Sequence, residues 1–448
     1  MTKASVWWNV GVGASASLIS LCAGFAATVS ETRPVTFTRD VAPILQQRCQ
    51  ECHRAGSMAP MSLITYEETR PWAKAIRERV VTKQMPPWHI DKNVGVQKFK
   101  NDMSLSDVQI ATIVRWVDSG APMGNPKDMP IPKEWPAGNE WQASKELGQP
   151  DLTIEAEPYT MTAHHQDVWW RPVTNIPITE PRWVRAVEMR PTTDQGRRIV
   201  HHAVAYLDQD EPANPDAPDR TAAFGGRGML MEWAIGKQYD LYRPNTGKLL
   251  LPGAQISWDV HIHAVGDEIR SGVQLGVWLY PKGQEPKYRT YLTGFQALPR
   301  GRLDIPPNTI MQNQGFTVLK QAAILENIQP HMHLRGKAMM LEAILPDGST
   351  QIVSYVSHFN FNWMTNYIYD DDAAPMFPKG TVIHVIAWHD NTTANKNNPD
   401  PDQWVGYGDR TVDEMAHAWV NVTYVSDDDY KEWAVKHKVA PAAASLNQ

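Results

Sequence analysis

The chain has 448 residues, of which 42% are hydrophobic and 21% charged, a balance that excludes a disordered or fibrous protein. This length exceeds what one hydrophobic core usually holds, so we expect several packed units. The formal net charge is −6 and no run of residues is rich in Lys or Arg, which argues against nucleic acid as a partner.

Residues 1–26 have the pattern of a secretory signal peptide. Lys3 precedes an apolar run of small residues from Val10 to Ala27, and Gly24-Phe25-Ala26 fits a cleavage site. An uncleaved anchor helix is the alternative, because the run is only marginally long enough to span hydrocarbon, and lipid attachment at Cys22 is a minor one. We therefore expect a periplasmic or otherwise exported protein with no stable membrane insertion after cleavage.

Without the leader, Cys49 and Cys52 are the only cysteines, and they stand in the motif Cys49-Gln50-Glu51-Cys52-His53. At this spacing two thioethers attach haem c, and the adjacent His53 ligates its iron. A thioredoxin-type motif is disfavoured, because His53 follows directly and no βαβ pattern surrounds it. The motif therefore predicts one covalent haem.

Helical patterns surround this motif. An apolar face runs through Thr38 to Gln50, and capping-box pairs at Thr65/Glu68 and Ser106/Gln109 each predict the start of a helix. We therefore expect a small all-α cytochrome c domain at residues 31–122, followed by a proline-rich linker at residues 123–150.

The sixth ligand of the haem iron is predicted to be Met85. It lies on a loop stiffened by Pro86 and Pro87, and a thioether ligand raises the haem potential. Met58, Met61 and His89 are the alternatives.

Beyond the linker the sequence changes character. Alternating runs such as Trp183 to Val187 and Val273 to Trp278 predict antiparallel strands and a β-sandwich class. Three histidine pairs lie in this half: His201-His202, His261 with His263, and His331 with His333. Residues i and i+2 of a strand share a face, so such a pair can present two imidazoles to one metal. With both cysteines assigned to haem, zinc and blue-copper sites are disfavoured, and redox-cycling copper is favoured.

Several stretches in this half resemble the copper type II, ascorbate-dependent monooxygenase family, which includes peptidylglycine α-hydroxylating and dopamine β-monooxygenases. They are His201-His202-Ala203-Val204, Asp259-Val260-His261, Pro330-His331-Met332-His333-Leu334-Arg335-Gly336 and Asp413-Glu414-Met415, with Asp390-Asn391 and Asn398-Pro399-Asp400-Pro401 between them. The resemblance runs from about Pro150 to Val425 in the family's order. The first segment resembles the cytochrome c modules fused to bacterial relatives.

The resemblance implies two antiparallel, jelly-roll-like β-sandwich domains that each hold one copper and face each other across a solvent-filled cleft. We place them at residues 151–300 and 301–430, with a tail at 431–448. By resemblance, the electron-transferring copper would be bound by His201, His202 and His261. The copper at which O2 is reduced and a C–H bond is hydroxylated would be bound by the catalytic set His331, His333 and Met415.

The remaining histidines are given structural roles. By the same resemblance, the third histidine of the first site follows a valine, so Val260 points to His261 as the ligand, and His263 would support the site from beside it or be a spectator. The pair His164-His165 lies in a polar run and is predicted to be a loop. The single histidines are expected in the core or on the surface; they are His358, His384, His389 and His417.

The sequence therefore predicts an exported dicopper monooxygenase that hydroxylates a C–H bond of a small organic substrate with O2. Electrons would enter through the haem from an external donor, which could be a reduced cytochrome, a quinol-linked carrier or a small reductant. The alternative is a non-enzymatic periplasmic copper-binding or electron-transfer protein.

Overall fold

The computed structural model describes residues 33–55, 59, 61–134, 140–211, 228–234, 237, 239–297 and 303–437. The predicted leader at residues 1–26 and the alternative haem ligand Met58 lie outside these ranges. From Val35 onward, the described chain forms one unit by its contacts. None of the helices in the described ranges is long and apolar enough to cross a membrane.

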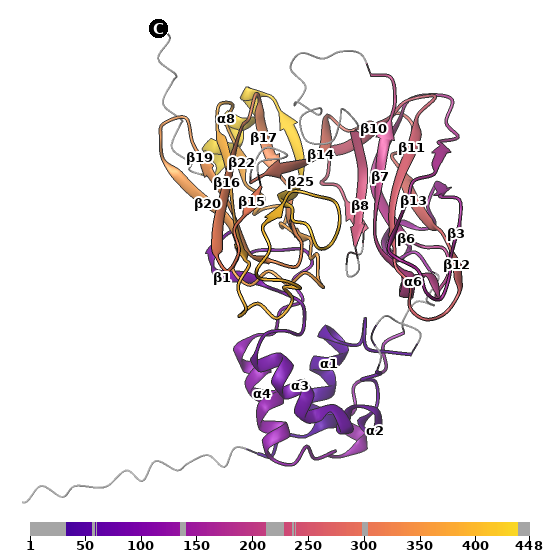
Figure 1. The fold of residues 1–448 in the computed structure, drawn as a ribbon, viewed down its shortest axis with the longest axis vertical. Helices are drawn as coiled ribbons and strands as arrows, with labels where there is room; N and C mark the ends of the chain where they lie inside the picture. The colour runs from indigo at the N-terminus through magenta and orange to yellow at the C-terminus, as the bar shows by residue number, and fades with distance from the viewer. Residues whose placement is uncertain are drawn as a thin grey trace, which may run out of the picture. The chain divides into compact units, whose positions relative to one another are not determined.

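The first segment consists mainly of short helices around an apolar core (Figure 1). Both predicted capping boxes are confirmed: Thr65 and Ser106 each cap a helix through reciprocal hydrogen bonds. The buried faces of these helices meet through Phe37, Ile113 and Trp116. The helices are η1 (Phe37–Val41), α1 (Ala42–Arg48), α2 (Tyr66–Thr69), η2 (Arg70–Trp72), α3 (Ala73–Val81) and α4 (Asp107–Asp118).

One strand interrupts this helical segment. β1 (Ile90–Gly95) pairs antiparallel with β20 (Thr350–Val356), and Ile90 lies opposite Val356. The expectation of an all-α segment over residues 31–122 therefore fails here. The strand lacks an alternating pattern and has a single fully buried residue, Ile90, so the sequence carries no strand signal. Its backbone groups are paired by joining the edge of an existing sheet.

The predicted linker contains two short helical turns, η3 (Pro126–Asp128) and α5 (Ser144–Leu147). Its last part packs against the sheet that follows. Trp141 is buried edge-on against Trp278, with ring centroids 6.0 Å apart. The carboxylate of Glu188 accepts hydrogen bonds from the backbone N–H groups of Gln142 (3.0 Å) and Ala143 (2.9 Å).

The prediction of antiparallel β-sheet in the second half is confirmed (Figure 1). In its first part, one sheet has the order β4-β11-β7-β8, and the path β2-β13-β6-β10 belongs to a second sheet. Apolar side chains from both sheets, among them Val187, Leu275, Ala203 and Ile256, form one core, an arrangement consistent with a β-sandwich. The strands are β2 (Leu152–Glu155), β3 (Tyr159–Met161), β4 (Val168–Trp170), β5 (Val173–Asn175), β6 (Arg182–Pro191), β7 (Val200–Asp208), β8 (Gly228–Ala234), β9 (Tyr239–Leu241), β10 (Thr246–Leu250), β11 (Gln255–Ile262), β12 (Ile269–Ser271) and β13 (Val273–Leu279), with helix α6 (Gly196–Ile199) before β7.

The second part is built in the same way. The sheet β1-β20-β19-β23-β16 shares a core with the strands β14-β25-β17-β22 and with β18. Helix α8 (Asp427–Lys436) buries Tyr430 and Ala434 in this core, so helical residues extend into the segment predicted as a tail. The strands are β14 (Tyr288–Gln296), β15 (Asp304–Ile305), β16 (Ile310–Val318), β17 (Ala322–Leu325), β18 (Asn327–Met332), β19 (Gly336–Ile344), β21 (Tyr367–Ile368), β22 (Met376–Phe377), β23 (Val382–Asp390), β24 (Val405–Gly406) and β25 (Ala416–Val425).

Hydrogen bonds cross the boundary that the sequence places at residue 300. β14 precedes that boundary, yet it pairs antiparallel with β25 from Thr290 to Gln296. On its other side β14 makes a short parallel pairing with β10. An 11-stranded sheet therefore runs through both parts of the β-rich half.

Candidate metal centres

Three histidines converge on neighbouring strands of the first sheet. His201 and His202 lie on β7 and His261 lies on β11, directly opposite His202 in the antiparallel register. One ligand atom from each of the three side chains lies within 4.8 Å of the others. Among the described residues, this group has the spacing of a metal site.

A β-bulge explains how two consecutive histidines reach one site. Side chains of successive strand residues normally point to opposite faces. The register shifts here: His261 pairs with His202 but Ile262 pairs with Val200, so His201 is an extra residue in β7. Such a bulge re-aims a side chain, and the ring of His201 comes to 5.5 Å from that of His202 and 5.2 Å from that of His261, centroid to centroid.

His261 rather than His263 belongs to this group. His263 follows the end of β11, and its ring lies 6.2 Å from that of His201. The ring of His261 is fixed from two sides: its Nε2 donates to Asp167 Oδ2 (2.9 Å), and it stacks on Trp169 at a centroid distance of 4.5 Å. This leaves Nδ1 of His261 turned inward. Buried Nδ1 atoms of His201 and His261 have no hydrogen-bond partner within the described chain.

His331 and His333 lie at the end of β18, with ring centroids 5.5 Å apart. His333 Nδ1 donates to the carbonyl oxygen of Asp413 (3.1 Å), so its Nε2 remains for a ligand. His331 is in register with His417 on β25, and the two rings stack at 4.7 Å. The sequence left His417 as a core or surface residue; its spacing of two from Met415 is the signal that could have placed it here.

Met415 immediately precedes β25 and is half-buried. Its carbonyl oxygen accepts a hydrogen bond from Nε2 of the buried His389 (3.2 Å). Asp413, whose carbonyl holds His333, is two residues away on the same turn. The structure thus brings the backbone of Met415 to the turn that orients His333.

Buried polar groups support this turn. The carboxylate of Glu414 accepts from the backbone N–H of His333 (2.9 Å) and of Arg335 (2.6 Å). The guanidinium of Arg335 is itself buried and donates to Asn391 Oδ1 (2.8 Å) and to the carbonyl of Val412 (2.9 Å). Burial raises the pKa of Glu414 to about 8. Residues of the Asp390-Asn391 and Asp413-Glu414-Met415 stretches therefore meet around one loop.

Four of these imidazoles are held in their neutral form, which is the form that binds a metal. Burial lowers the pKa of His201 and of His333 to about 4. It lowers the pKa of His202 and of His331 well below the ordinary value, and the neighbouring histidines lower it further. Nδ1 of His331 is also buried without a hydrogen-bond partner within the described chain.

The two histidine sets lie close together. The rings of His202 and His331 are 6.4 Å apart, centroid to centroid. Phe361 stacks on His201 at 5.4 Å and meets His333 edge-on at 6.4 Å. The family resemblance implies a solvent-filled cleft between two separate sites, whereas here side chains of both sets are near contact distance, with an aromatic ring beside them.

The cysteine motif follows α1, which ends at Arg48, and Cys49 is the C-cap of this helix. Both thiols are free, and burial raises the pKa of Cys49 to about 12 and that of Cys52 to about 11. His53 Nδ1 donates to the carbonyl oxygen of Met61 (3.3 Å), which leaves Nε2 for a ligand. Two free thiols three positions apart and a histidine oriented in this way fit covalent haem.

Met85 and His89 lie beside a groove of about 670 Å³. Its other wall comes from the segment 357–363, which includes His358 and Phe359 and also carries Phe361. Burial, with a smaller contribution from His358, lowers the pKa of His89 to about 4.

Other histidines lie outside the two sets. His164 and His165 are exposed between β3 and β4. His358 is exposed. His384 lies on β23 near Glu342 (3.0 Å) and Gln314 (3.1 Å).

No family model matches this chain, and no curated protein matches it. Solved structures that resemble it include three from infectious bursal disease virus. They are that of the Gx strain (9% identity, 62% of this chain and 73% of that chain, TM-score 0.19), the VP2 subviral particle (10%, 63% and 75%, TM-score 0.17) and the T13 viral particle (9%, 61% and 71%, TM-score 0.18). Likenesses this weak carry no argument about fold or function.

Proposed function

We propose that this chain is an exported dicopper monooxygenase that hydroxylates a C–H bond of a small organic substrate with O2 and receives electrons through haem c. The observation that carries the proposal is the pair of adjacent imidazole sets. Burial keeps His201 and His202 of the first set and His331 and His333 of the second neutral, and each set has a buried ring nitrogen without a hydrogen-bond partner within the described chain. Buried polar atoms of this kind are expected to have a ligand.

His201, His202 and His261 would hold the electron-transferring copper, and His331, His333 and Met415 the copper that reacts with O2. When bound, copper supplies one-electron redox chemistry and O2 activation. Burial within the chain keeps His201, His202, His331 and His333 neutral. Asp167 orients His261, and the carbonyl of Asp413 orients His333.

Cys49 and Cys52 would attach the haem, with His53 and Met85 as its axial ligands. Haem c supplies a one-electron carrier whose potential Met ligation raises. Electrons would pass from the haem toward the imidazole sets. This is supported by the groove between Met85 and the segment 357–363, because Phe361 of that segment packs beside rings of both imidazole sets. An external reductant would load the haem.

The test begins with composition. Mature protein loaded with copper should contain one covalent haem and two coppers by elemental analysis and pyridine haemochrome assay. The reduced protein should consume O2 only when a substrate is present, and candidate substrates should gain label from 18O2. A single bound copper, or zinc retained against copper, contradicts the two-site assignment. Two coppers with no substrate-coupled O2 consumption favour the alternative, an electron-transfer protein.

A further inference from the structure

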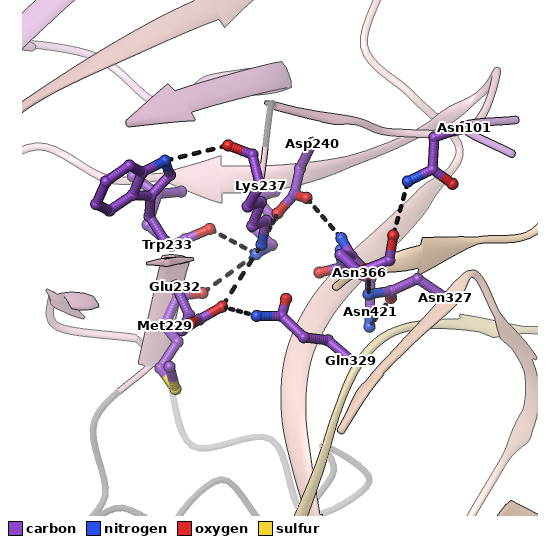
Figure 2. A network of polar contacts seen from close by, with 12 residues as sticks. Asn101, Met229, Glu232, Trp233, Lys237, Asp240, Asn327, Gln329, Asn366 and Asn421 are labelled. Carbon is purple, nitrogen blue, oxygen red and sulfur yellow. Dashed lines mark hydrogen bonds and ion pairs between the residues drawn. The ribbon is translucent and has the colours of Figure 1, made fainter. Parts of the chain in front are cut away.

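The polar network drawn in Figure 2 joins the two parts of the β-rich half. Lys237 lies near the carboxylates of Glu232 and Asp240, and Asp240 accepts a hydrogen bond from Asn366 (3.3 Å). None of the residues labelled in Figure 2 is a predicted metal ligand. A different buried network, around His389 at the end of β23, does reach the segments that carry the ligands of the second site.

Both ring nitrogens of His389 have partners within the protein. The amide nitrogen of Asn313, on β16, can only donate, so Nδ1 of His389 accepts this hydrogen bond (3.1 Å). The ring proton is therefore on Nε2, which donates to the carbonyl oxygen of Met415 (3.2 Å). His389 and Asn313 are at most 2% exposed. With both nitrogens engaged, His389 supports the second site and is not a further ligand.

The strand end that carries His389 also contacts the segment that carries His333. Asn391 follows His389 by two residues, and its Oδ1 accepts a hydrogen bond from Nε of Arg335 (2.8 Å). Arg335 is two residues beyond His333. One strand end therefore holds the segment of His333 and the backbone of Met415 at the same time.

Glu414 connects the same two segments from the other side. It immediately precedes Met415, and its buried carboxylate accepts from the backbone N–H groups of His333 (2.9 Å) and Arg335 (2.6 Å). Nε2 of His389 lies 3.6 Å from Oε2 of Glu414, farther than its 3.2 Å from the carbonyl oxygen of Met415. The proton of His389 is therefore directed to the backbone of Met415 and not to the neighbouring carboxylate.

A methionine ligand depends strongly on a fixed backbone. Its side chain has three rotatable bonds, so holding the thioether in one conformation costs conformational entropy. A backbone that is already in place limits the cost to the side chain itself. The hydrogen bond from His389 supplies this restraint at Met415.

We propose that His389 is a positioning residue that fixes Met415 as the thioether ligand of the second copper. This inference rests on the proposed two-copper function and names the residue on which its thioether ligand depends. Without the donor at position 389, His331 and His333 would still hold a metal, but the thioether would be lost from it. Because a soft thioether ligand favours Cu(I), the second site would then bind Cu(I) less tightly.

The test is copper K-edge X-ray absorption of the mature protein with its haem attached and both sites loaded with Cu(I). The wild-type spectrum should contain a sulfur shell from Met415 besides the nitrogen shell of the imidazoles. His389→Leu removes the donor at similar volume and should reduce the sulfur amplitude at least two-fold while the protein still binds two coppers. Its second site should also lose about 10- to 100-fold in Cu(I) affinity, measured by competition with a chelator.

Further variants separate positioning from general destabilisation. His389→Gln places an amide nitrogen near the position of Nε2, so it can still donate to Met415 and should keep most of the sulfur amplitude. His384→Leu replaces the other histidine of β23, whose ring contacts Glu342 and Gln314, and its spectrum should match the wild type. If His389→Leu does not fold, Asn313→Leu takes its place. It removes the donor that keeps the proton on Nε2, and it should also lower the sulfur amplitude.

The outcomes distinguish the inference from the proposed function. Wild-type sulfur amplitude in folded His389→Leu protein, or in Asn313→Leu where that variant is used, would overturn the positioning role and leave the proposed function standing. An equal loss of amplitude in His384→Leu would overturn it as well, because the effect would then be a general one. Wild-type protein that binds two Cu(I) ions without a sulfur shell would exclude Met415 as a ligand. Wild-type protein that does not bind two coppers refutes the proposed function itself.

Discussion

One hydrogen bond decides which nitrogen of His261 is available to a metal. His261 Nε2 donates to Asp167 Oδ2, and the carboxylate makes the imidazole a stronger donor through Nδ1. Asp167→Asn keeps the shape but removes the charge, and it should weaken copper binding at the first site by about 10- to 100-fold. Competition titration with a Cu(I) chelator measures this. The control is Glu157→Gln, which neutralises an exposed carboxylate; equal affinity in both variants would contradict the role of Asp167.

The proposal that Met85 is the axial ligand of the haem iron can be tested by replacing this residue. Met85→His replaces a thioether by a stronger donor, so the haem potential should fall and the weak Met-to-iron band at the red end of the oxidised spectrum should disappear. Spectroelectrochemistry of the purified protein measures both effects. Met61→Leu is the control, because the contact of Met61 with His53 is made by its carbonyl oxygen, and this variant should keep the band. If instead Met61→Leu loses the band and Met85→His keeps it, the axial ligand is Met61.

At the level of elements, the sequence predicted what local patterns encode. The capping boxes at Thr65 and Ser106 were readable because each is complete within four consecutive residues. The strand pairs were readable from alternation, and the structure confirms antiparallel sheet. The β-bulge at His201 could not be predicted from the sequence, because a bulge depends on the register with the partner strand and not on the identity of the extra residue. For the same reason the pairing of β1 with β20 could not be foreseen.

Lys248 links two sheets of the first part. It lies on β10, and its Nζ donates to the carbonyl oxygens of Leu230 (2.7 Å) and Met229 (3.3 Å) on β8. Burial lowers the pKa of Lys248 from 10.5 to about 7, and Asp240 and Glu326 oppose this shift while Lys237 and Arg289 add to it. Between these two pH values the unfolded chain binds more protons than the folded one, so wild-type stability gains from rising pH.

Replacement of Lys248 by Met removes this titration. The free energy of unfolding of Lys248→Met, relative to wild type, should therefore be highest near pH 7 and should decrease toward pH 10, by at most about 1.4 kcal/mol per pH unit. Urea unfolding at several pH values in this window measures the trend. Lys282→Met, at an exposed lysine, serves as the control and should show a difference from wild type that does not change with pH. A pH-independent difference for Lys248→Met would show that the lysine is not strained by burial.

At the scale of the whole molecule, the sequence located candidate residues but not the contacts between distant parts. Glu232 carries no motif, and His417 carries only its spacing of two from Met415. His417 reaches His331 because β25 pairs with β18, and Glu232 meets Gln329 across the interface. The sequence placed a boundary at residue 300, yet β14 and β25 join across it. Contacts of this kind depend on how sheets pack, which a single sequence does not specify.

The proposed electron route separates the roles of the two copper sets, and single-turnover experiments can test it. His202→Ala removes a ligand of the first set, so a protein with reduced haem should stall, because electrons no longer pass from the haem to that site. Met415→His should keep a metal at the second site, since imidazole also binds copper, but it should stabilise Cu(II) and disfavour reaction with O2. In this variant the haem should still be oxidised, while little hydroxylated product forms.

The two readouts are haem oxidation, followed by stopped-flow absorbance, and product per oxidised haem, measured by mass spectrometry with labelled O2. His165→Ala, at an exposed histidine outside both sets, provides the control and should match wild type in both readouts. The His202 variant is expected to lose electron transfer from the haem to the first site, whereas the Met415 variant is expected to lose only the reaction at the second site. Both variants should therefore lose product, but only the Met415 variant should still oxidise its haem. If both variants form product at the wild-type yield per oxidised haem, neither residue is a functional ligand, and the assignment of the two sets by family resemblance fails at these positions.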